Sequence, residues 1–502
     1  MNAKNRPWRS ALSIASGLLL ALAQPPYAVG LLGLVALVPL LLALRRQSLL
    51  VRAALGWICG TVWSFAMVGS WLWPAAANAL EIGNSGAFLV TLAATQMYGG
   101  LHIAVFAMLL GQRRRGGIAD CFAIAAIWVA VELLRSAAFG GVPWGLLGHS
   151  LWQTPELIQL AAFTGVAGVS FWMVVVNAAL VEAVLRMRAR RSPAAPLLLG
   201  LGLIAAVWLH GSWRCGRPLA GEPVVVRVVH SDWQLQRSAG ARVGGGADDD
   251  RHVDRMIELS RGVGPAEITV WPEASVRLLL SRNPSRAHDL YLLARDTGGD
   301  LLFGAPRSGD GELFNSYYRV SANAADIVES VDKRRLVPLA ESAWRGLPAS
   351  HNHFAAGERA ASLGVGKGRS VGVLICFESL FPDLAIASGG DFLVNPSNDA
   401  RVGSGAGQQA AMAVFRAVEN GRSLLRVANA GPSLLVDGYG RIEREVRGWG
   451  AVLWRVPPRL ASTPFRSIAK LWAQILPRRS SGDGLLAWAC LAFTLAQLCW
   501  RG

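Results

Sequence analysis

Three short motifs place a carboxylate, an ammonium and a thiol directly after apolar stretches that are expected to be strands. Glu273 follows Trp-Pro, Lys333 opens a basic run, and Cys376 follows Val-Leu-Ile. In open α/β folds, ligands gather outside the carboxyl ends of strands. A thiol is a strong nucleophile but is mostly protonated at neutral pH, so a carboxylate must take its proton and a nearby cation can lower its pKa. Because an ammonium can also stabilise the oxyanion formed when a carbonyl is attacked, the set predicts nucleophilic catalysis.

Each of these residues also has an ordinary structural explanation. A cysteine after apolar residues is commonly a small buried hydrophobe, Glu273 can cap a following helix, and Lys333 lies in a basic run typical of a solvated loop. Two residue counts favour a catalytic role for Lys333 and Cys376. Only four of the 49 lysines and arginines are lysine, so a retained lysine suggests a need for a compact ammonium. Cys376 is the single cysteine between residues 221 and 457, and such an isolated thiol is a candidate for reactivity.

Metal and nucleotide sites are not indicated. The eight histidines show no ligand spacing, and the nearest pair, His351 and His353, is typical of a loop. The glycine-rich stretch 364–368 lacks the flanking pattern of a phosphate-binding loop. The sequence therefore predicts catalysis by side chains, with no cofactor and no metal.

The composition indicates that much of the chain lies in lipid. Of 502 residues, 52% are hydrophobic and 16% are charged, whereas about a quarter are charged in an ordinary soluble globule. The same figures exclude intrinsic disorder. The net charge of +16 does not imply a nucleic-acid partner, because basic clusters such as 113–115 and 186–191 lie at the ends of apolar runs. Six cysteines in a chain of this length do not form a disulfide framework.

Eight apolar runs are candidates for membrane-spanning helices, each of which needs about 20 mainly apolar residues. The first run also resembles a cleaved signal peptide, because basic residues precede it and Ala21-Leu22-Ala23 resembles a peptidase site. The spans that follow it favour an uncleaved helix. The eight runs are 10–24, 29–44, 54–73, 87–111, 118–138, 161–185, 195–210 and 484–500.

Basic residues mark every second loop between these runs. They occur at the N-terminus and after the second, fourth and sixth runs, whereas the loops 74–86 and 139–160 contain no Arg or Lys. Short loops rich in Arg and Lys stay on the cytoplasmic side of a membrane. Seven crossings therefore place residues 211–483 outside the cytoplasm.

The block 221–457 has the composition of an α/β domain. Short β-rich apolar runs alternate with helical stretches at 250–261 and 406–421, and about 240 residues suffice to bury a core. The glycine-rich polar segments 238–250 and 399–408 predict loops. The expected strands are Val224–Val229, Ile268–Trp271, Leu301–Phe303, Val371–Cys376 and Phe392–Val394.

These patterns predict a polytopic α-helical membrane bundle with about eight transmembrane helices, joined to an exported α/β domain. The bundle occupies 1–210 and holds seven of the spans. The catalytic domain occupies 221–457, and 458–502 form a linker with the last span.

The order Glu273, Lys333, Cys376 resembles the Glu-Lys-Cys triad of the nitrilase, or carbon–nitrogen hydrolase, superfamily. With apolar runs on both sides, the chain resembles the apolipoprotein N-acyltransferase family, a membrane-embedded member of that superfamily. Asn395–Asp399 and Glu419–Asn429 also match family stretches. The resemblance covers nearly the whole chain. It implies an αββα sandwich for the exported domain, in a multi-pass protein of a bacterial inner membrane with the catalytic domain on the periplasmic side.

The resemblance also implies a ping-pong acyl transfer through a thioester. Glu273 acts in it as the general base, Cys376 as the nucleophile and Lys333 as the oxyanion donor. Glu341 and Glu378 resemble supporting carboxylates that position Lys333 and the nucleophile turn. The implied partners are the bilayer, a membrane phospholipid as acyl donor, and the diacylglyceryl-cysteine amine of an apolipoprotein as acceptor.

Several positions depart from the family pattern. Phe377 stands in place of tyrosine, Ser342 in place of an aromatic residue, and Arg401 begins Arg-Val-Gly in place of Trp-Phe-Gly. After the first strand, His-Ser-Asp replaces Gln-x-Asn, with Trp233 next to it. We expect Trp233, Phe377, Asn398 and Arg401 to contact the substrate. These departures affect the substrate's identity more than the reaction type.

Two other functions stay open. A membrane-tethered amidase or nitrilase would hydrolyse a small amide with the same triad and needs only an aqueous mouth, whereas transfer of a lipid acyl group needs a site that opens toward the bilayer. A catalytically silent binding scaffold is opposed by the intact triad. Apolar loop residues favour the transferase; they are Trp344, Leu347, Leu380 and Phe381.

Overall fold

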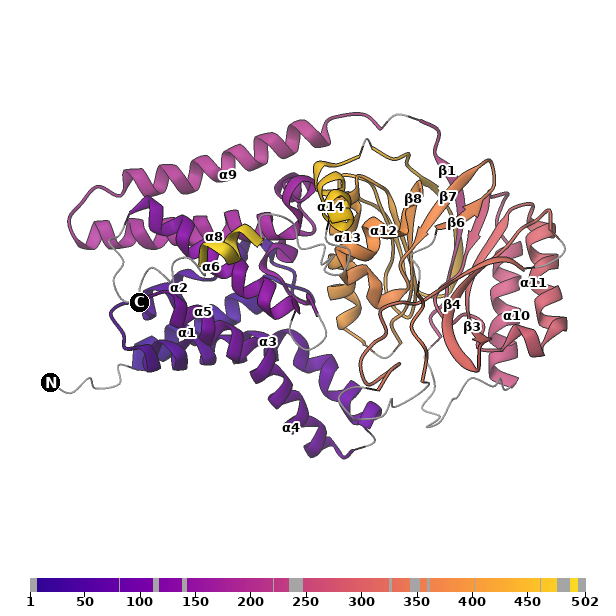
Figure 1. The fold of residues 1–502 in the computed structure, drawn as a ribbon, viewed down its shortest axis with the longest axis horizontal. Coiled ribbons are helices and arrows are strands. Elements are labelled where there is room, and N and C mark those ends of the chain that lie inside the picture. The colour runs from indigo at the N-terminus through magenta and orange to yellow at the C-terminus, as the bar shows by residue number, and fades with distance from the viewer. Residues whose placement is uncertain are drawn as a thin grey trace. The chain divides into compact units, whose positions relative to one another are not determined.

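The computed structural model of the protein divides into two compact units. Met1–Arg217 and Asp483–Gly502 form the helical unit, and Pro218–Gly482 form the α/β unit (Figure 1). The structure describes residues 7–80, 82–111, 117–137, 142–219, 221–233, 247–324, 327–343, 353–358, 362–400, 402–460, 462–475 and 488–494.

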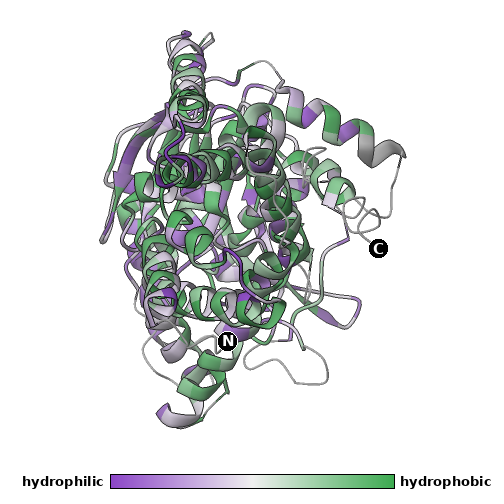
Figure 2. Cartoon of the chain, turned by 90° about the vertical axis from the view of Figure 1, so that its left-hand side faces the viewer, coloured by the Kyte–Doolittle hydropathy of each residue, from purple (hydrophilic) through white to green (hydrophobic). Residues whose placement is uncertain are grey.

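The helical unit is built from apolar helices, and hydrophobic residues run along their length (Figure 2). Large apolar side chains project outward from them; Leu198 and Leu201 of α9 are 70% and 65% exposed. Such exposure is compatible with lipid. The helices are α1 (Pro7–Leu22), α2 (Val38–Ala43), α3 (Leu49–Leu80), α4 (Asn84–Thr95), α5 (Leu101–Leu109), α6 (Ile118–Ala137), α7 (Pro155–Ile158), α8 (Ala161–Arg188) and α9 (Ala194–Cys215), with shorter turns η1 (Gly30–Leu34), η2 (Gln96–Gly100) and η4 (Leu147–Leu151).

Within the described ranges, four helical stretches are long and apolar enough to cross a membrane. They correspond to the third, fourth, sixth and seventh predicted runs. The helix of α6 matches the fifth run, but three charged residues, Asp120, Glu132 and Arg135, lie along its 20 residues. The four stretches are Leu49–Asn78, Asn84–Leu109, Ala161–Arg188 and Ala194–Cys215.

The predicted span 29–44 is not one continuous α-helix. It consists of η1 and the short helix α2, with non-helical residues between them. Pro39 lies in the first turn of α2, where its missing N–H leaves no helical hydrogen bond unmade. Of the predicted last span, 484–500, the structure describes residues 488–494, which are helical.

Glycine allows α3 to approach the helix formed by α4, η2 and α5. A Cβ added to Gly60 would lie 2.2 Å from the carbonyl oxygen of Gly99, and one added to Gly56 would lie 2.5 Å from the carbonyl oxygen of Ile103. Because the two glycines are four residues apart, they share one face of α3. Small residues at this spacing are typical of helix packing in membranes.

The α/β unit contains two six-stranded sheets. The strand order is β12-β1-β2-β3-β4-β5 in one and β11-β10-β9-β8-β7-β6 in the other. The central strands β1, β2 and β3 are parallel, as are β7, β8 and β9. The strands are β1 (Val224–His230), β2 (Ile268–Val270), β3 (Asp300–Gly309), β4 (Glu312–Val320), β5 (Ile327–Asp332), β6 (Ser362–Val365), β7 (Arg369–Val373), β8 (Phe392–Asn398), β9 (Leu424–Asn429), β10 (Ser433–Val436), β11 (Ile442–Val446) and β12 (Gly450–Val456).

Helices cover the outer faces of both sheets, which gives an αββα order of layers (Figure 1). One apolar core joins the facing sheets and includes Val226 and Val373. A second core, with Met256 and Leu290, lies between the first sheet and its helices. The helices are α10 (Ala247–Arg261) and α11 (Pro284–Thr297) on the first sheet, α12 (Pro382–Ser388) and α13 (Gly405–Asn420) on the second, and α14 (Pro464–Ile475) packed on α12 and α13.

The expected strands and helices of this unit are present, and their bounds differ at the ends. The loop prediction is wrong at 247–250, which opens α10, and at 405–408, which opens α13. Three aspartates stand in the first turn of α10, where a helix favours negative charge. The predicted linker also contains a helix, α14.

Candidate active site

The carboxyl ends of the parallel strands in both sheets meet at one place. Ser231, just beyond β1, forms a bridge with Asn429 at the end of β9. Its hydroxyl donates to the Asn429 side-chain oxygen over 2.9 Å. Cys376 follows β7, and Glu273 follows β2, so both project from this end of the sandwich.

Glu273 is held on a tight turn that a glycine makes possible. A Cβ added to Gly304 of β3 would lie 2.5 Å from the backbone nitrogen of Ala274 and 2.9 Å from the Cα of Glu273. The preceding Trp271 is fully buried, and its carbonyl accepts a 2.7 Å hydrogen bond from the Tyr317 hydroxyl. Glu273 is 5% exposed, so the turn presents a buried carboxylate.

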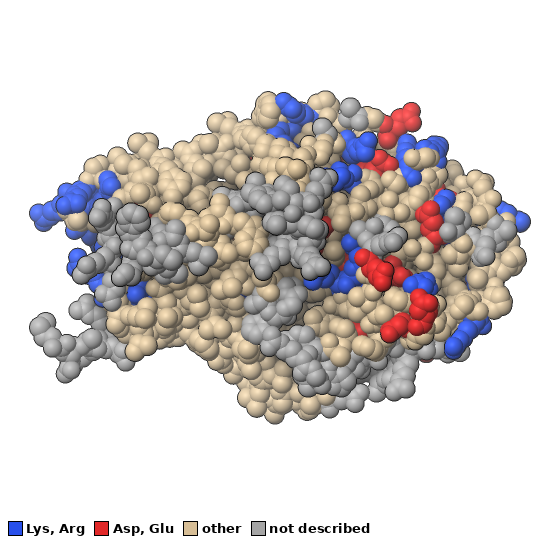
Figure 3. Space-filling view, viewed as in Figure 1, with Lys and Arg blue, Asp and Glu red and all other residues tan. Residues whose placement is uncertain are grey.

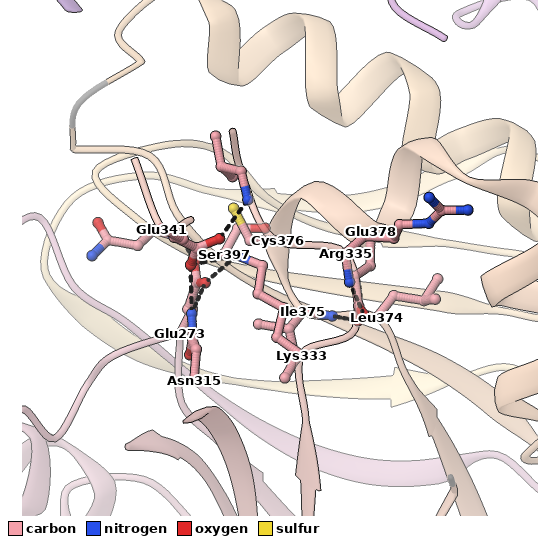
Figure 4. Close-up of polar contacts among 12 residues, drawn as sticks. Glu273, Asn315, Lys333, Arg335, Glu341, Leu374, Ile375, Cys376, Glu378 and Ser397 are labelled. Carbon is pink, nitrogen blue, oxygen red and sulfur yellow. Dashed lines mark hydrogen bonds and ion pairs between the residues drawn. The ribbon is translucent and has the colours of Figure 1, made fainter. Parts of the chain in front are cut away.

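Lys333 lies between two carboxylates. Its Nζ is 2.9 Å from Oε1 of Glu273 and 2.9 Å from Oε1 of Glu341. Nδ2 of Asn315 donates to the same two oxygens, each over 2.8 Å, so the four side chains form a closed ring (Figure 4). Lys333 is 1% exposed, which rules out the solvated loop charge.

Cys376 occupies a strained turn at the start of a 3-10 helix, η6 (Cys376–Leu380). Its φ is 50°, a left-handed conformation that non-glycine residues rarely adopt. The Cys376 carbonyl accepts hydrogen bonds from Nδ2 of Asn395 (3.1 Å) and Oγ of Ser379 (3.0 Å). These contacts hold the turn and direct the sulfur toward the carboxylates (Figure 4).

Glu378 ties the nucleophile turn to the lysine loop. One carboxylate oxygen accepts from the backbone N–H of Ile375 over 2.8 Å. The other accepts from the backbone N–H groups of Arg334 and Arg335, over 2.7 and 3.3 Å. Glu378 is 1% exposed, and it fixes the position of Cys376 relative to Lys333 by these bonds.

The charges of the site keep the resting cysteine protonated. Burial and the nearby Glu273 carboxylate raise the pKa of Cys376 well above its ordinary value, although Lys333 lowers it. Burial lowers the pKa of Lys333, but Glu273 and Glu341 outweigh it and raise that pKa well above its ordinary value. Cys376 is therefore a thiol and Lys333 an ammonium in the resting site, and a base must take the thiol proton before Cys376 can act as a nucleophile. Glu273 lies where it can accept that proton.

Two family models match the chain. The model described as the apolipoprotein N-acyltransferase N-terminal domain matches residues 16–179, and the carbon-nitrogen hydrolase model matches residues 239–452. A protein named apolipoprotein N-acyltransferase from Geobacter metallireducens is 30% identical over 458 residues, which cover 86% of this chain and 85% of the relative. The chain belongs to the apolipoprotein N-acyltransferase family.

Other members of the family match over still more of the chain. Proteins of the same name from Pseudomonas paraeruginosa and Azotobacter vinelandii are 30% and 31% identical, and each alignment covers 96% of this chain and 95% or 94% of the relative. Among solved structures, an amidase from Nesterenkonia sp. AN1 is 19% identical with a TM-score of 0.38, and it covers 50% of this chain and 100% of its own.

The residues expected to contact the substrate lie in different settings. Phe377 is buried and packs edge-to-face on Phe381, with ring centroids 5.2 Å apart. The backbone N–H of Asn398 donates to Oε2 of Glu273 over 2.9 Å, so Asn398 contacts the base. Trp233 stacks on His252 at 4.3 Å, and Asn429 binds its backbone. Arg401 lies outside the described residues.

Of the apolar loop residues that favoured a lipid substrate, Leu380 and Phe381 are buried. They therefore do not form an open apolar surface in this structure. Trp344 and Leu347 lie outside the described residues. In the described part of the chain, no three His, Cys, Asp or Glu side chains are grouped as a metal site requires.

Three asparagines organise the site although sequence reasoning gave them no role; Asn395 and Asn429 lie in the family-like stretches, and Asn315 was missed. Asn315 bridges Glu273 and Glu341, Asn395 holds the Cys376 carbonyl, and Asn429 binds Asn398 through a 3.0 Å side-chain hydrogen bond. A signal was present, because asparagine is depleted in strands and these three lie in β4, β8 and β9. A buried amide within a strand needs polar partners, which points to a functional centre.

Proposed function

We propose that this protein transfers an acyl chain from a membrane phospholipid to the N-terminal amine of a diacylglyceryl-cysteine on an apolipoprotein. Membership of the family, over both units, supports lipoprotein N-acylation and an acyltransferase activity. The observation that carries the reaction type is the buried ring of Glu273, Lys333, Glu341 and Asn315 beside the strained turn of Cys376.

In the first half-reaction, Cys376 attacks the ester carbonyl of the phospholipid. Glu273 takes the thiol proton as the sulfur–carbon bond forms, and the Lys333 ammonium stabilises the tetrahedral oxyanion. When the ester C–O bond breaks, the proton passes to the leaving oxygen. A lysophospholipid departs and a thioester remains on Cys376.

In the second half-reaction, the free amine of the acceptor attacks the thioester. Glu273 accepts a proton from the amine, the C–S bond breaks, and the proton returns to the sulfur. The products are an amide and the original thiol. Glu341 and Glu378 position the groups that react: Glu341 shares Lys333 with Glu273, and Glu378 holds the Cys376 turn.

A transfer assay tests this function. Full-length protein in detergent, given a phospholipid with a labelled acyl chain and a diacylglyceryl-cysteine peptide, should yield a labelled, N-acylated peptide. Release of labelled free fatty acid without acylated peptide, at equal protein, would favour a hydrolase of the amidase type. If neither the acylated peptide nor the free fatty acid forms, the result would favour a catalytically silent scaffold.

We also propose the arrangement of the chain in the membrane. In this arrangement about eight spans anchor the protein in a bacterial inner membrane, with a catalytic domain at 221–457 in the periplasm. Basic residues gather at the end of the helical unit where α8 meets α9 (Figure 3), and Glu182 pairs with Arg186 there over 2.9 Å. That clustering supports a cytoplasmic location for this end.

Reporter fusions check this arrangement. Fusions after Arg115 and Arg191 should report the cytoplasm, and fusions within 240–250 should report the exterior, because alternate basic loops resist export. A cytoplasmic signal from 240–250 would contradict the proposed side of the catalytic domain.

A further inference from the structure

Four basic residues converge beside the end of α13. The backbone N–H of Leu460 donates to the Gly421 carbonyl over 2.9 Å, so the chain before α14 runs directly past the end of α13. The Thr463 hydroxyl, which donates to the Glu419 carbonyl, holds the next turn there. These bonds bring together side chains from three segments; they are Arg422, Arg459, Arg466 and Lys470, called the basic cluster.

The basic cluster has little compensating negative charge. Asp391 is the one carboxylate within ion-pairing distance of any of the four among the described residues, and it lies 3.2 Å from Arg459. Burial, followed by the charges of Arg466 and Arg459, lowers the pKa of Arg422 to about 10. Arg466, followed by burial and Arg422, lowers the pKa of Lys470. The cations therefore repel one another.

Two of these arginines carry buried N–H groups that nothing in the described chain satisfies. Arg422 is 4% exposed and Arg466 is 9% exposed, and Nε of each has no hydrogen-bond partner among the described residues. Leaving a buried charged donor unpaired is costly. Arg466 also lies in the first turn of α14, where the helix dipole disfavours a cation. An anion would relieve all of these costs together.

The position of the cluster along the chain indicates the source of that anion. Phe465 of α14 is buried where the helix packs on α12 and α13, whereas Leu471, next to Lys470, is 56% exposed and leaves an apolar side chain on the outer face of this helix. Eight residues, 476–483, separate the end of α14 from the apolar run 484–500. At most about 3.5 Å per residue, they reach roughly 28 Å, so α14 must lie close to the bilayer if that run enters it.

We propose that the basic cluster binds the phosphate group of an anionic phospholipid. Four cations against one carboxylate favour a lipid with net negative charge over a zwitterionic one. The site goes beyond the proposed acyl transfer, because within the described part of the chain none of its residues hydrogen-bonds to the ring around Lys333. It acts as an anchor for the α/β unit at the membrane surface.

Native mass spectrometry of the full chain in detergent tests this proposal. With added phosphatidylglycerol, wild-type protein should retain bound lipid at least about 10-fold more strongly than with phosphatidylcholine. Each basic residue near an anionic surface strengthens binding about five-fold, so Arg466→Gln with Lys470→Gln should weaken phosphatidylglycerol retention roughly 25-fold. Arg466→Lys should keep most of the binding, because it keeps the charge.

The matched control removes two arginines elsewhere in the same unit. Arg444→Gln with Arg447→Gln changes the net charge equally on β11 and the turn after it, and should leave retention unchanged. Equal retention by the cluster variant and this control would overturn the proposal, provided both unfold at the wild-type temperature. If the cluster variant fails to fold, Lys470→Gln alone, at an exposed position, should still lower retention about five-fold. If the wild-type protein retains inorganic phosphate but not phosphatidylglycerol in the same measurement, the assignment of the ligand as a lipid is wrong.

Discussion

Replacing Cys376 by alanine should abolish both acyl-enzyme formation and transfer to the acceptor peptide. Cys376 supplies the thiol at the start of η6, and no thioester can form without it, whereas the nearby Ser379 hydroxyl is engaged with the Cys376 carbonyl. Cys376→Ser should be nearly as inactive, because a serine hydroxyl is far harder to ionise than a thiol and this site already opposes negative charge on the nucleophile. Single-turnover acylation with a labelled phospholipid measures both.

The control for this prediction is another buried cysteine, Cys215, at the end of α9. Cys215→Ala removes a sulfur of the same kind and should acylate at the wild-type rate. Alanine at 376 removes little volume, so the variant should elute as folded protein from size-exclusion chromatography. Full transfer activity in Cys376→Ala would show that Cys376 is not the nucleophile.

Lys333→Arg should slow acylation of Cys376 by roughly 100-fold or more. The ammonium fits between two carboxylate oxygens 2.9 Å away in a pocket that is 1% exposed. Guanidinium is planar and forked, so its donors cannot occupy the same point. Loss of one oxyanion donor costs about 100- to 1000-fold in rate, and a misplacement of about 1 Å can cost about 100-fold. Arginine should therefore fail although this chain uses it almost everywhere else.

An exposed lysine provides the control. Lys367 lies 3.0 Å from Glu267 and its side chain is 67% exposed, so Lys367→Arg should acylate like wild type. Since Lys333 is buried with two partners, its replacement is also expected to lower thermal stability, and the rate must be normalised to folded protein. If the normalised acylation rate of Lys333→Arg lies within about three-fold of wild type, Lys333 has a structural role and is not the oxyanion donor.

Much of the α/β unit could be predicted because its strands are short apolar runs that end at the motif residues. Glu273 and Cys376 follow such runs directly, and the parallel strands bring their ends together. The ring partner Asn315 could not be placed in the same way, because it comes from an antiparallel strand whose register opposite β5 is set by tertiary pairing. Local sequence does not carry that register.

The helical unit was harder to predict at its edges. Apolar composition identified α3, α8 and α9. It could not show that the segment 29–44 is broken, because a run of apolar residues looks the same in sequence whether it forms one helix or two short ones. Pro39 stands in the first turn of α2, which fits a helix that begins there rather than one that continues from η1. The loop errors at the starts of α10 and α13 have a similar origin, since polar or glycine-rich first turns resemble loops.

Mass spectrometry of the purified wild-type protein tests the thioester most directly. After incubation with phospholipid and without acceptor, a peptide containing Cys376 should carry one acyl chain. Hydroxylamine should remove this adduct, because it cleaves thioesters, and addition of the diacylglyceryl-cysteine peptide should transfer it to the acceptor amine. An unmodified Cys376 in protein that still acylates the acceptor would contradict the account.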